Sequence, residues 1–332
     1  MSGGRFKLVL VAALSALFAG PSGCVFVSGS INPFARGTEP LEEHTVAGEG
    51  RDKILLLDIS QVISDEEQQT AFGFKRREST VARVEEELRH AAGDDRVKAV
   101  ILRINSPGGT VTASDVVYHR LMSFKADRGL PLVAQMMDVA TSGGYYVALA
   151  ADEIVASPTT VTGSIGVVLY GFNLEGLLAK VGVTNQTIKS GTHKDIGSPL
   201  RRMTAEESAI MQSVLDEMQS RFVGLVRQRR PRFDGAAAAL DGRILTAGQA
   251  LEAKLVDRIG YLDDAVTAAR TRAQLGQARV VMYRRPGEYA HNIYSRAAVA
   301  GGGVQFNLLH LETGGLLSGG PRFMYLWLPF GE

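Results

Sequence analysis

The sequence has a single cysteine, a net charge close to zero and no internal repeat, and each of these features argues against a class of protein. Its 36 basic and 35 acidic side chains leave a formal net charge of +1. Nothing therefore favours a nucleic-acid partner or strong steering of a charged ligand. Because no repeat of solenoid period is found, a stacked-repeat architecture is not expected. With Cys24 as the only cysteine, the chain has no pair of thiols for an internal disulfide.

The rest of the composition is typical of a globular protein. Of the 332 residues, 45% are hydrophobic and 21% are charged. A chain of this length can bury a sizeable core in one large or two modest domains. We expect neither a metal ion nor a cofactor.

The first 24 residues have the order of a secretory signal. Arg5 and Lys7 precede an apolar stretch at 8–18 that is too short to span a bilayer comfortably, and small residues follow. The sequence Ser-Gly-Cys at 22–24 resembles the end of a bacterial lipoprotein signal, although Pro21 replaces the usual aliphatic residue. We expect a signal sequence at 1–23 and lipidation of Cys24, which leaves no thiol to act as a nucleophile.

Two other interpretations of this segment stay open. It can be an uncleaved N-terminal anchor or, less favoured, a buried segment of the core. With either the lipid or the anchor, the protein is attached to a membrane of the cell envelope, and the folded domain lies outside the cytoplasm.

The pattern after residue 24 predicts three further regions. Residues 24–51 mix Gly, Ser, Pro, Asn and Glu without a period and are predicted to be a flexible tether. A folded domain is predicted at 52–275. A C-terminal extension interrupted by glycines is predicted at 276–332, where the apolar stretch 323–329 can form an edge strand, meet a neighbouring subunit or touch lipid.

Within 52–275, strand-like and helix-like segments alternate, which predicts an α/β fold with parallel βαβ units. The expected strands are continuous apolar runs, typical of strands covered on both faces. They are expected at 53–59, 97–104, 132–137, 153–156, 165–169 and 185–189. Helices are expected at 79–90, 112–124, 142–150, 172–181, 204–229, 246–254 and 262–273, and the long one begins with a capping-box sequence at Thr204.

Ser142 is the strongest candidate for a catalytic residue. It lies in Ala-Thr-Ser-Gly-Gly-Tyr-Tyr at 140–146, between a predicted strand and a predicted helix. A serine at that junction has free backbone N–H groups beside it. Upstream, Ser-Pro-Gly-Gly at 106–109 forms a second glycine turn after a strand. Its bare N–H groups suit the oxyanion of acyl transfer, so a peptidase is the leading hypothesis.

A serine nucleophile needs a base, and two residues compete for that role. Among the six histidines, only His193 lies in a short polar turn with a carboxylate nearby, at Asp195. Lys194 is the preferred base, because its turn is expected near strand ends, where burial lowers the pKa of a lysine. A lone lysine in a loop is more often a solvated charge, so only its combination with Ser142 supports the role.

Four motifs in this order resemble the bacterial signal peptide peptidases of the SppA type in their single-domain form. They are Asn-Ser-Pro-Gly-Gly at 105–109, Ser-Gly-Gly-Tyr-Tyr at 142–146, Thr-Gly-Ser-Ile-Gly at 162–166 and Lys-Asp-Ile-Gly-Ser-Pro at 194–199. The match covers roughly 52–275, and Tyr-Leu-Trp at 325–327 is similar to the family's end. The first motif also resembles the Clp protease proteolytic subunit.

The resemblance implies a fold, a site and an assembly. The fold is the crotonase/Clp-protease-like repeated ββα superhelix with a helical C-terminal region. Ser142 would be the nucleophile, Lys194 the general base and Ser164 the residue that orients the lysine. The N–H groups of Gly109 and Gly143 would form the oxyanion hole. In single-domain members the lysine comes from a neighbouring subunit, which implies a homo-oligomeric ring, an octamer, with a shared site.

The function expected is therefore that of a serine endopeptidase, which cleaves remnant signal peptides or other extended peptides through an acyl-enzyme. Two alternatives are kept. An acyl-CoA hydratase or isomerase shares the fold, but acyl-CoA is cytoplasmic and an export signal argues against it. The second alternative is a catalytically silent membrane-anchored scaffold, and the presence of both Ser142 and Lys194 argues against it.

Overall fold

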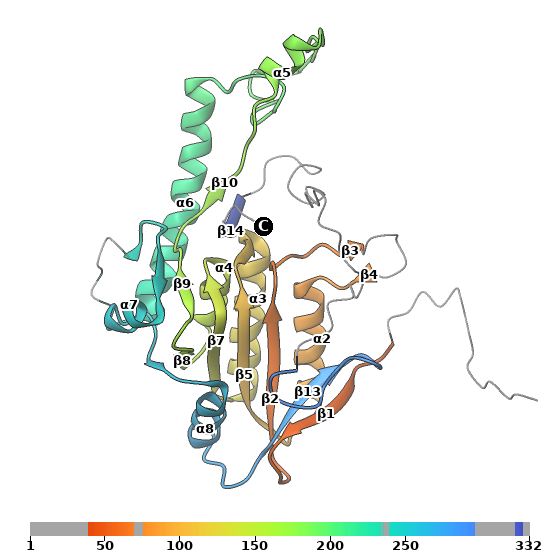
Figure 1. Cartoon of the computed structure of the whole chain (residues 1–332), viewed down its shortest axis with the longest axis vertical. Helices are drawn as coiled ribbons and strands as arrows, with labels where there is room; N and C mark the ends of the chain where they lie inside the picture. The colour runs from red at the N-terminus through yellow and green to blue at the C-terminus, as the bar shows by residue number, and fades with distance from the viewer. Residues whose placement is uncertain (1–38, 70–75, 234, 236–238, 296–322, 328–332) are drawn as a thin grey trace, which may run out of the picture. The chain divides into compact units, whose positions relative to one another are not determined.

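A computed structural model describes residues 39–69, 76–233, 235, 239–295 and 323–327. The chain divides into two compact units, Met1–Glu39 and Pro40–Glu332, and the second contains every element described below (Figure 1). The predicted signal sequence and the lipidation at Cys24 lie outside the described residues. None of the described helices combines the length and the apolar character needed to cross a bilayer.

The second unit alternates strands and helices along most of its length. The strands are β1 Glu42–Ala47, β2 Lys53–Ser60, β3 Gln68–Gln69, β4 Arg76–Arg77, β5 Val97–Ser106, β6 Gly108–Thr110, β7 Leu132–Thr141, β8 Glu153–Ala156, β9 Val161–Gly163, β10 Val168–Leu169, β11 Ile244–Thr246, β12 Arg258–Ile259, β13 Arg279–Arg284 and β14 Phe323–Leu326. The helices are α2 Thr80–Ala92, α3 Val111–Arg128, α4 Gly143–Ala148, α5 Glu175–Lys180, α6 Ala205–Arg229, α7 Ala247–Glu252 and α8 Leu262–Arg272.

The main sheet confirms the predicted α/β class. Its strand order is β1-β13-β2-β5-β7-β8-β12, and β9 and β11 pair off this path. The neighbours from β13 to β12 in this order are parallel. Side chains of β2 alternate between two buried clusters, with Leu55 and Leu57 in one and Ile54 and Leu56 in the other. Both faces of the sheet are therefore covered, which explains the continuous apolar runs.

Two consecutive ββα units carry the part of the sheet that matters most for the site. In the first, β2 is followed by Ile63, which forms a bridge with Gly109, and then by α2. In the second, β5 is followed by β6 and then by α3. The short second member of the later unit, β6, belongs to a separate three-stranded sheet with the order β10-β14-β6. The predicted ββα repeat is confirmed by this arrangement.

Two sequence-based boundaries are wrong, because residues placed outside the folded domain belong to the main sheet. β1 falls in the predicted tether and pairs antiparallel with β13, which falls in the predicted extension and also pairs with β2. The sequence of β1, Glu-Glu-His-Thr-Val-Ala, lacks an apolar run because β1 lies at the edge of the sheet. In β13, by contrast, residues 280–284 are all buried, and its apolar run was a usable signal.

Residues 171–206 differ from the rest of the unit and are called the arm here. None of them is buried. The predicted strand at 185–189 is wrong, since these residues have no regular structure, and the helix predicted at 172–181 is reduced to α5. The Leu174 N–H donates to the Pro199 carbonyl at 2.7 Å. In Figure 1, α5 lies beside the N-terminal end of α6.

Candidate active site

Ser142 lies in a strained turn between β7 and α4. Its φ of 52° and ψ of −115° are unusual for a residue with a side chain, and only 1% of its surface is exposed. A backbone held in such a region costs about 1–3 kcal/mol and is typically found at functional sites. The Ser142 N–H donates to the Gly163 carbonyl at 2.8 Å, which fixes the turn against β9. The predicted strand-to-helix junction is confirmed, and the structure shows in addition that the backbone at this junction is strained.

The hydroxyl group of Ser142 is not used to cap α4. Its Oγ makes a long contact of 3.5 Å with the Gly166 carbonyl oxygen. An oxygen that makes no short hydrogen bond is available to a substrate or a base. The hydroxyl is therefore not engaged in a short hydrogen bond, although only 1% of the residue's surface is exposed in the single chain.

The two glycine turns approach each other closely beside Ser142. A Cβ built on Gly143 would lie 3.0 Å from the Gly109 backbone nitrogen and would also overlap the Ser114 hydroxyl. A Cβ built on Gly108, which has a φ of +108°, would lie 2.8 Å from the Gly143 nitrogen. Only glycine permits this approach. The structure thus brings the two glycine turns that carry the Gly109 and Gly143 amides together next to Ser142.

Two side chains hold the first glycine turn in place, and sequence reasoning assigned no role to either. The buried Ser106 hydroxyl accepts a hydrogen bond from the Gly108 N–H at 3.1 Å and donates to the Gln61 carbonyl. The Asn105 side-chain oxygen accepts from the Val139 N–H at 3.1 Å, which joins the ends of β5 and β7. Both residues were visible as part of the first motif, but their roles depend on partners distant in sequence.

Ser164 lies on the segment that borders Ser142. It has a φ of 49°, follows Gly163 at +79°, and is 7% exposed. Its N–H donates to the Arg243 carbonyl at 2.7 Å. The same segment supplies the contacts of Gly163 and Gly166 to Ser142. The structure therefore places Ser164 near the predicted nucleophile, on a turn of two residues with positive φ.

Lys194 and His193 are not brought to Ser142 within one chain. Both lie on the arm, and His193 contacts Glu206 and Glu207 at the start of α6, at 3.6 and 3.9 Å. Further along α6, Gln219 donates to the Ile165 carbonyl at 3.1 Å, beside the Ser142 turn. Twelve residues separate Glu207 from Gln219, which is about 18 Å along a helix. Lys194 therefore lies too far from Ser142 of the same chain for its side chain to reach the serine hydroxyl.

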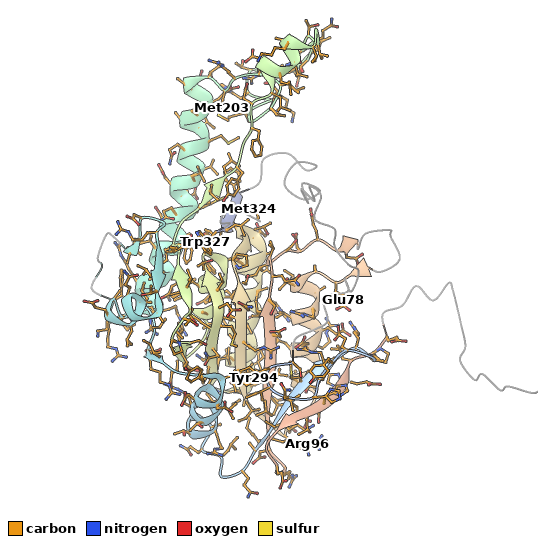
Figure 2. The ribbon with its side chains drawn as sticks, in the orientation of Figure 1. Glu78, Arg96, Met203, Tyr294, Met324 and Trp327 are labelled. Carbon is orange, nitrogen blue, oxygen red and sulfur yellow. The ribbon has the colours of Figure 1, made fainter. Side chains whose placement is uncertain are left out.

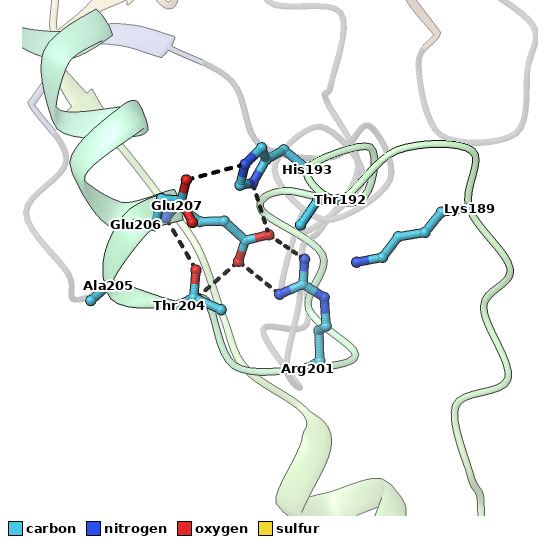
Figure 3. Close-up of a pocket in the computed structure, with 8 residues that line it drawn as sticks. All are labelled: Lys189, Thr192, His193, Arg201, Thr204, Ala205, Glu206 and Glu207. Atoms are coloured by element: carbon cyan, nitrogen blue, oxygen red, sulfur yellow. Dashed lines mark hydrogen bonds and ion pairs between the residues drawn. The ribbon is translucent and has the colours of Figure 1, made fainter.

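A pocket of about 460 Å³ lies on the arm and not at Ser142 (Figure 3). Arg201 is at its centre and bonds to Asp195 at 2.6 Å and to Glu207 at 2.5 Å. Hydrogen bonds from Arg201 lower the pKa of Glu207 to about 2 and lower the pKa of Asp195 as well. Both carboxylates are ion-paired with Arg201 and join the arm to the start of α6.

His193 also fails as the base of a Ser-His-Asp triad in this chain. Asp195, its expected carboxylate, is bound by Lys189 at 2.6 Å and by Arg201. The acidic groups near His193 are those of Glu206 and Glu207 instead. Lys194 is exposed, and its side chain makes no hydrogen bond or ion pair with the rest of the described chain. Of the two candidates, only Lys194 has a side chain free to enter another site.

Comparison with known proteins assigns the chain to a family. Residues 125–276 match the family described as Peptidase family S49. A protein of Enterococcus faecium named "Putative signal peptide peptidase SppA" is 35% identical over 256 residues, which cover 76% of this chain and 74% of that protein. The serine protease SPPA, chloroplastic, of Arabidopsis thaliana is 34% identical over 57% of this chain and 28% of its own length.

One solved structure adds a more distant likeness. A mutant of the 1510-N membrane-bound stomatin-specific protease is 15% identical, with a TM-score of 0.42. The likeness covers 66% of this chain and 85% of that chain.

Proposed function

The chain belongs to peptidase family S49 as a serine peptidase of the SppA type, and we propose that it cleaves extended peptides through a Ser142–Lys194 dyad. The observation that carries the proposal is the strained turn that holds Ser142 beside the Gly109 and Gly143 amides. Family membership favours peptidase chemistry over the scaffold and acyl-CoA alternatives.

In the proposed reaction, the Ser142 hydroxyl attacks the carbonyl carbon of the scissile bond. Its proton passes to the base and then to the leaving amine, and an acyl-enzyme remains for water to hydrolyse. The Gly109 and Gly143 N–H groups would stabilise the oxyanion, and one such donor is typically worth about 3 kcal/mol. Because both amides are held by backbone packing, they need no rearrangement during the reaction.

The base is proposed to be Lys194 of a neighbouring copy of the chain, with Ser164 orienting its ammonium group. Two observations support a site shared between subunits. The first is that the turn of Lys194 meets α6 at Glu207, about 18 Å along the helix from Gln219, which contacts the segment beside Ser142. The second is that a lysine acts as a base when burial lowers its pKa, whereas Lys194 is exposed in the single chain. A partner subunit would supply that burial.

The arm also exposes apolar side chains in the way that is typical of a protein–protein interface. Eight large apolar side chains on it are exposed by 37% or more, and Ile188 is 99% exposed. Exposed apolar surface of this density usually marks an interaction site. We take a second copy of the chain as its partner, because that partner would bury the apolar side chains and deliver Lys194. The eight are Phe172, Leu174, Leu177, Val181, Val183, Ile188, Leu200 and Met203.

The natural substrates are proposed to be remnant signal peptides, with the protein anchored in the cell envelope through the segment that ends at Cys24. The support for this is the order of basic, apolar and small residues before Cys24. An anchored enzyme would meet apolar peptides where they are released, at the membrane. The peptidase domain would then act outside the cytoplasm.

Mixing two inactive variants tests the shared dyad. Ser142→Ala and Lys194→Ala should each abolish hydrolysis of an unstructured apolar peptide, whereas His193→Ala should remain active. When the two inactive variants are mixed and allowed to exchange subunits, intact sites should form and part of the activity should return. The molar mass of each sample, measured by light scattering, should show an oligomer.

Other outcomes would change the assignment. Activity that survives Lys194→Ala and not His193→Ala would make His193 the base. Two inactive variants that stay inactive after proven subunit exchange would place both residues of the dyad in one chain. Lys180→Ala is the matched control, because it removes another lysine of the arm without touching the 194–199 motif and should leave activity unchanged.

A further inference from the structure

Gln219 of α6 joins two segments that are far apart in sequence and that meet beside Ser142. Its side-chain nitrogen donates to the Ile165 carbonyl at 3.1 Å and to the Leu240 carbonyl at 3.0 Å. A primary amide has two N–H groups, so both are used here, and both acceptors are backbone oxygens. Among side chains of this length, only glutamine supplies two such donors without a charge. The contact is therefore specific for this residue type.

The two segments form the turn around Ser164. β9 and β11 pair antiparallel as far as Gly163 and Ile244. The Ser164 N–H continues the pairing by donating to the Arg243 carbonyl at 2.7 Å. The Gln219 contacts follow these pairs along both segments and close the end of the ladder. Ser164 has a φ of 49° there, and such a backbone persists only when its surroundings hold it.

The segment that carries Ser164 also borders the proposed nucleophile on two sides of Ile165. The Ser142 N–H donates to the Gly163 carbonyl at 2.8 Å, and the Ser142 Oγ is 3.5 Å from the Gly166 carbonyl oxygen. Ile165 lies between these two glycines in sequence and is fully buried. The amide of Gln219 thus fixes the segment at a point between its two contacts with Ser142.

Gln219 lies on the half of α6 that is packed into the body. Phe222 and Val226 are fully buried, and Arg229 donates to the carbonyl of the C-cap residue of α4 at 2.8 Å. The opposite end of the helix carries the arm, and Met203, next to the N-cap residue, marks that end in Figure 2. The amide therefore extends from a part of the helix that packing holds in place.

We propose that Gln219 is a positioning residue of the peptidase, which fixes the Ser164 turn against Ser142 through its two hydrogen bonds. This inference rests on the proposed function, in which Ser164 orients the ammonium group of Lys194. Gln219 acts through the turn and makes no hydrogen bond to Ser142 itself. Without its two bonds the turn is free to relax, so the lysine is oriented less well. The attack by Ser142 then slows, while peptide binding is kept.

Steady-state kinetics of full-length variants on an unstructured apolar peptide test the proposal. Gln219→Met keeps the length of the side chain and removes both donors. It should lower kcat about 10- to 100-fold and change KM by less than about twofold, because the orientation of the base matters in the transition state and not for binding. Gln212→Met is the matched control. Gln212 is exposed on the same helix, where it donates to Asp216 at 2.7 Å, and its variant should keep the wild-type kcat.

A glutamate variant gives a second readout, which a purely structural role would not produce. Gln219→Glu keeps the shape, but an ionised carboxylate cannot donate and would face two carbonyl oxygens. When the introduced carboxyl group is protonated, it regains one donor. The kcat of Gln219→Glu relative to wild type should therefore rise as the pH falls from about 8 to 5.5. The same ratio for Gln219→Met should stay constant, and a constant ratio for both variants would contradict the proposal.

A shorter amide covers the case in which Gln219→Met does not fold, as judged by circular dichroism. Gln219→Asn keeps the amide but ends one methylene short, and should lower kcat with KM unchanged. Folded Gln219 variants with a wild-type kcat, or with a loss confined to KM, would overturn this inference alone, provided that wild-type activity depends on Ser142. Wild-type protein that does not cleave the peptide, or whose activity survives Ser142→Ala, would overturn the proposed function and this inference with it.

Discussion

The region around Ser142 and the arm that carries Lys194 are stabilised by different interactions. In the region around the serine, Ser142, Tyr146 and Tyr325 are each at most 1% exposed, and packing fixes their positions. In the arm no residue is buried, and ion pairs around Arg201 join its turns. Packed interiors hold atoms to a fraction of an ångström, whereas the arm has no buried side chain to fix it in this way. The proposed oxyanion site is thus held by packing, and the proposed base is carried on the part of the chain that lacks it.

Charged groups in the two regions show the same contrast. In the body, burial raises the pKa of Glu87 to about 7, although Arg83 lies 3.8 Å away. Where the arm meets the start of α6, hydrogen bonds from Arg201 lower the pKa of Glu207 to about 2. Both glutamates are buried, at 1% and 2% exposed, but Arg83 is 3.8 Å from Glu87 whereas Arg201 hydrogen-bonds to Glu207 at 2.5 Å. The comparison teaches that desolvation decides the pKa of Glu87 and that hydrogen bonding decides the pKa of Glu207.

The largest expected effect comes from Ser142, the proposed nucleophile. Both Ser142→Ala and Ser142→Gly should lower kcat by about 10⁴-fold or more, because the attacking hydroxyl is lost. They should differ in stability, since glycine tolerates a φ of 52° and alanine does not. Thermal melting should show the glycine variant to be more stable by about 1 kcal/mol. Equal melting temperatures would contradict the strain assigned to this turn.

Next in size is the effect of crowding the oxyanion site. A Cβ at Gly143 would overlap the Ser114 hydroxyl and lie 3.0 Å from the Gly109 nitrogen. Gly143→Ala should therefore lower kcat about 10²- to 10³-fold, the usual cost of losing one oxyanion donor. The control is Gly129→Ala, where no atom lies within 4 Å and φ is +62°. It should cost about 1 kcal/mol of stability and leave kcat unchanged.

The buried glutamate of the body gives a stability effect. The pKa of Glu87 is raised in the folded state, so the folded protein binds more protons than the unfolded chain between about pH 4.5 and 7. Stability should fall as the pH rises through that range, by about 3 kcal/mol for a shift of this size. Denaturant unfolding of Glu87→Gln should lack this fall. A wild-type-like pH profile in the variant would assign the effect to another group.

The smallest effect is expected in the arm. Arg201→Gln removes the cation shared by Asp195 and Glu207, so amides of the 189–207 segment should exchange faster while the melting temperature changes little. Arg272→Gln, which removes a surface ion pair with Glu153 in the body, should not affect that exchange. Because the pKa of Glu207 is lowered, acidification from about pH 4.5 towards 2 should loosen the wild-type arm in the same way.

Much of the fold could be predicted because its signals are local. The helix with its capping box at Thr204 begins where expected, and the strand expected at 153–156 has the same bounds as β8. In both cases neighbours in sequence supply the hydrogen bonds or the apolar run. The prediction failed at 185–189, where an isolated polar segment has no partner strand among the described residues, and at β1, where a polar edge strand gains its partner only through β13.

The sequence by itself determined that Ser142 lies at a strand-to-helix turn, that two glycine turns accompany it, and that Lys194 lies on a polar loop. Only the tertiary structure decided three further points. It brought Gly109 and Gly143 together, kept Lys194 away from its own Ser142, and paired Tyr325 with Gly109. The physical reason is that the turns depend on the conformational preferences of a few adjacent residues. The packing around Ser142 depends on pairings between segments far apart in sequence, such as Tyr325 with Gly109, whose partners no local pattern specifies.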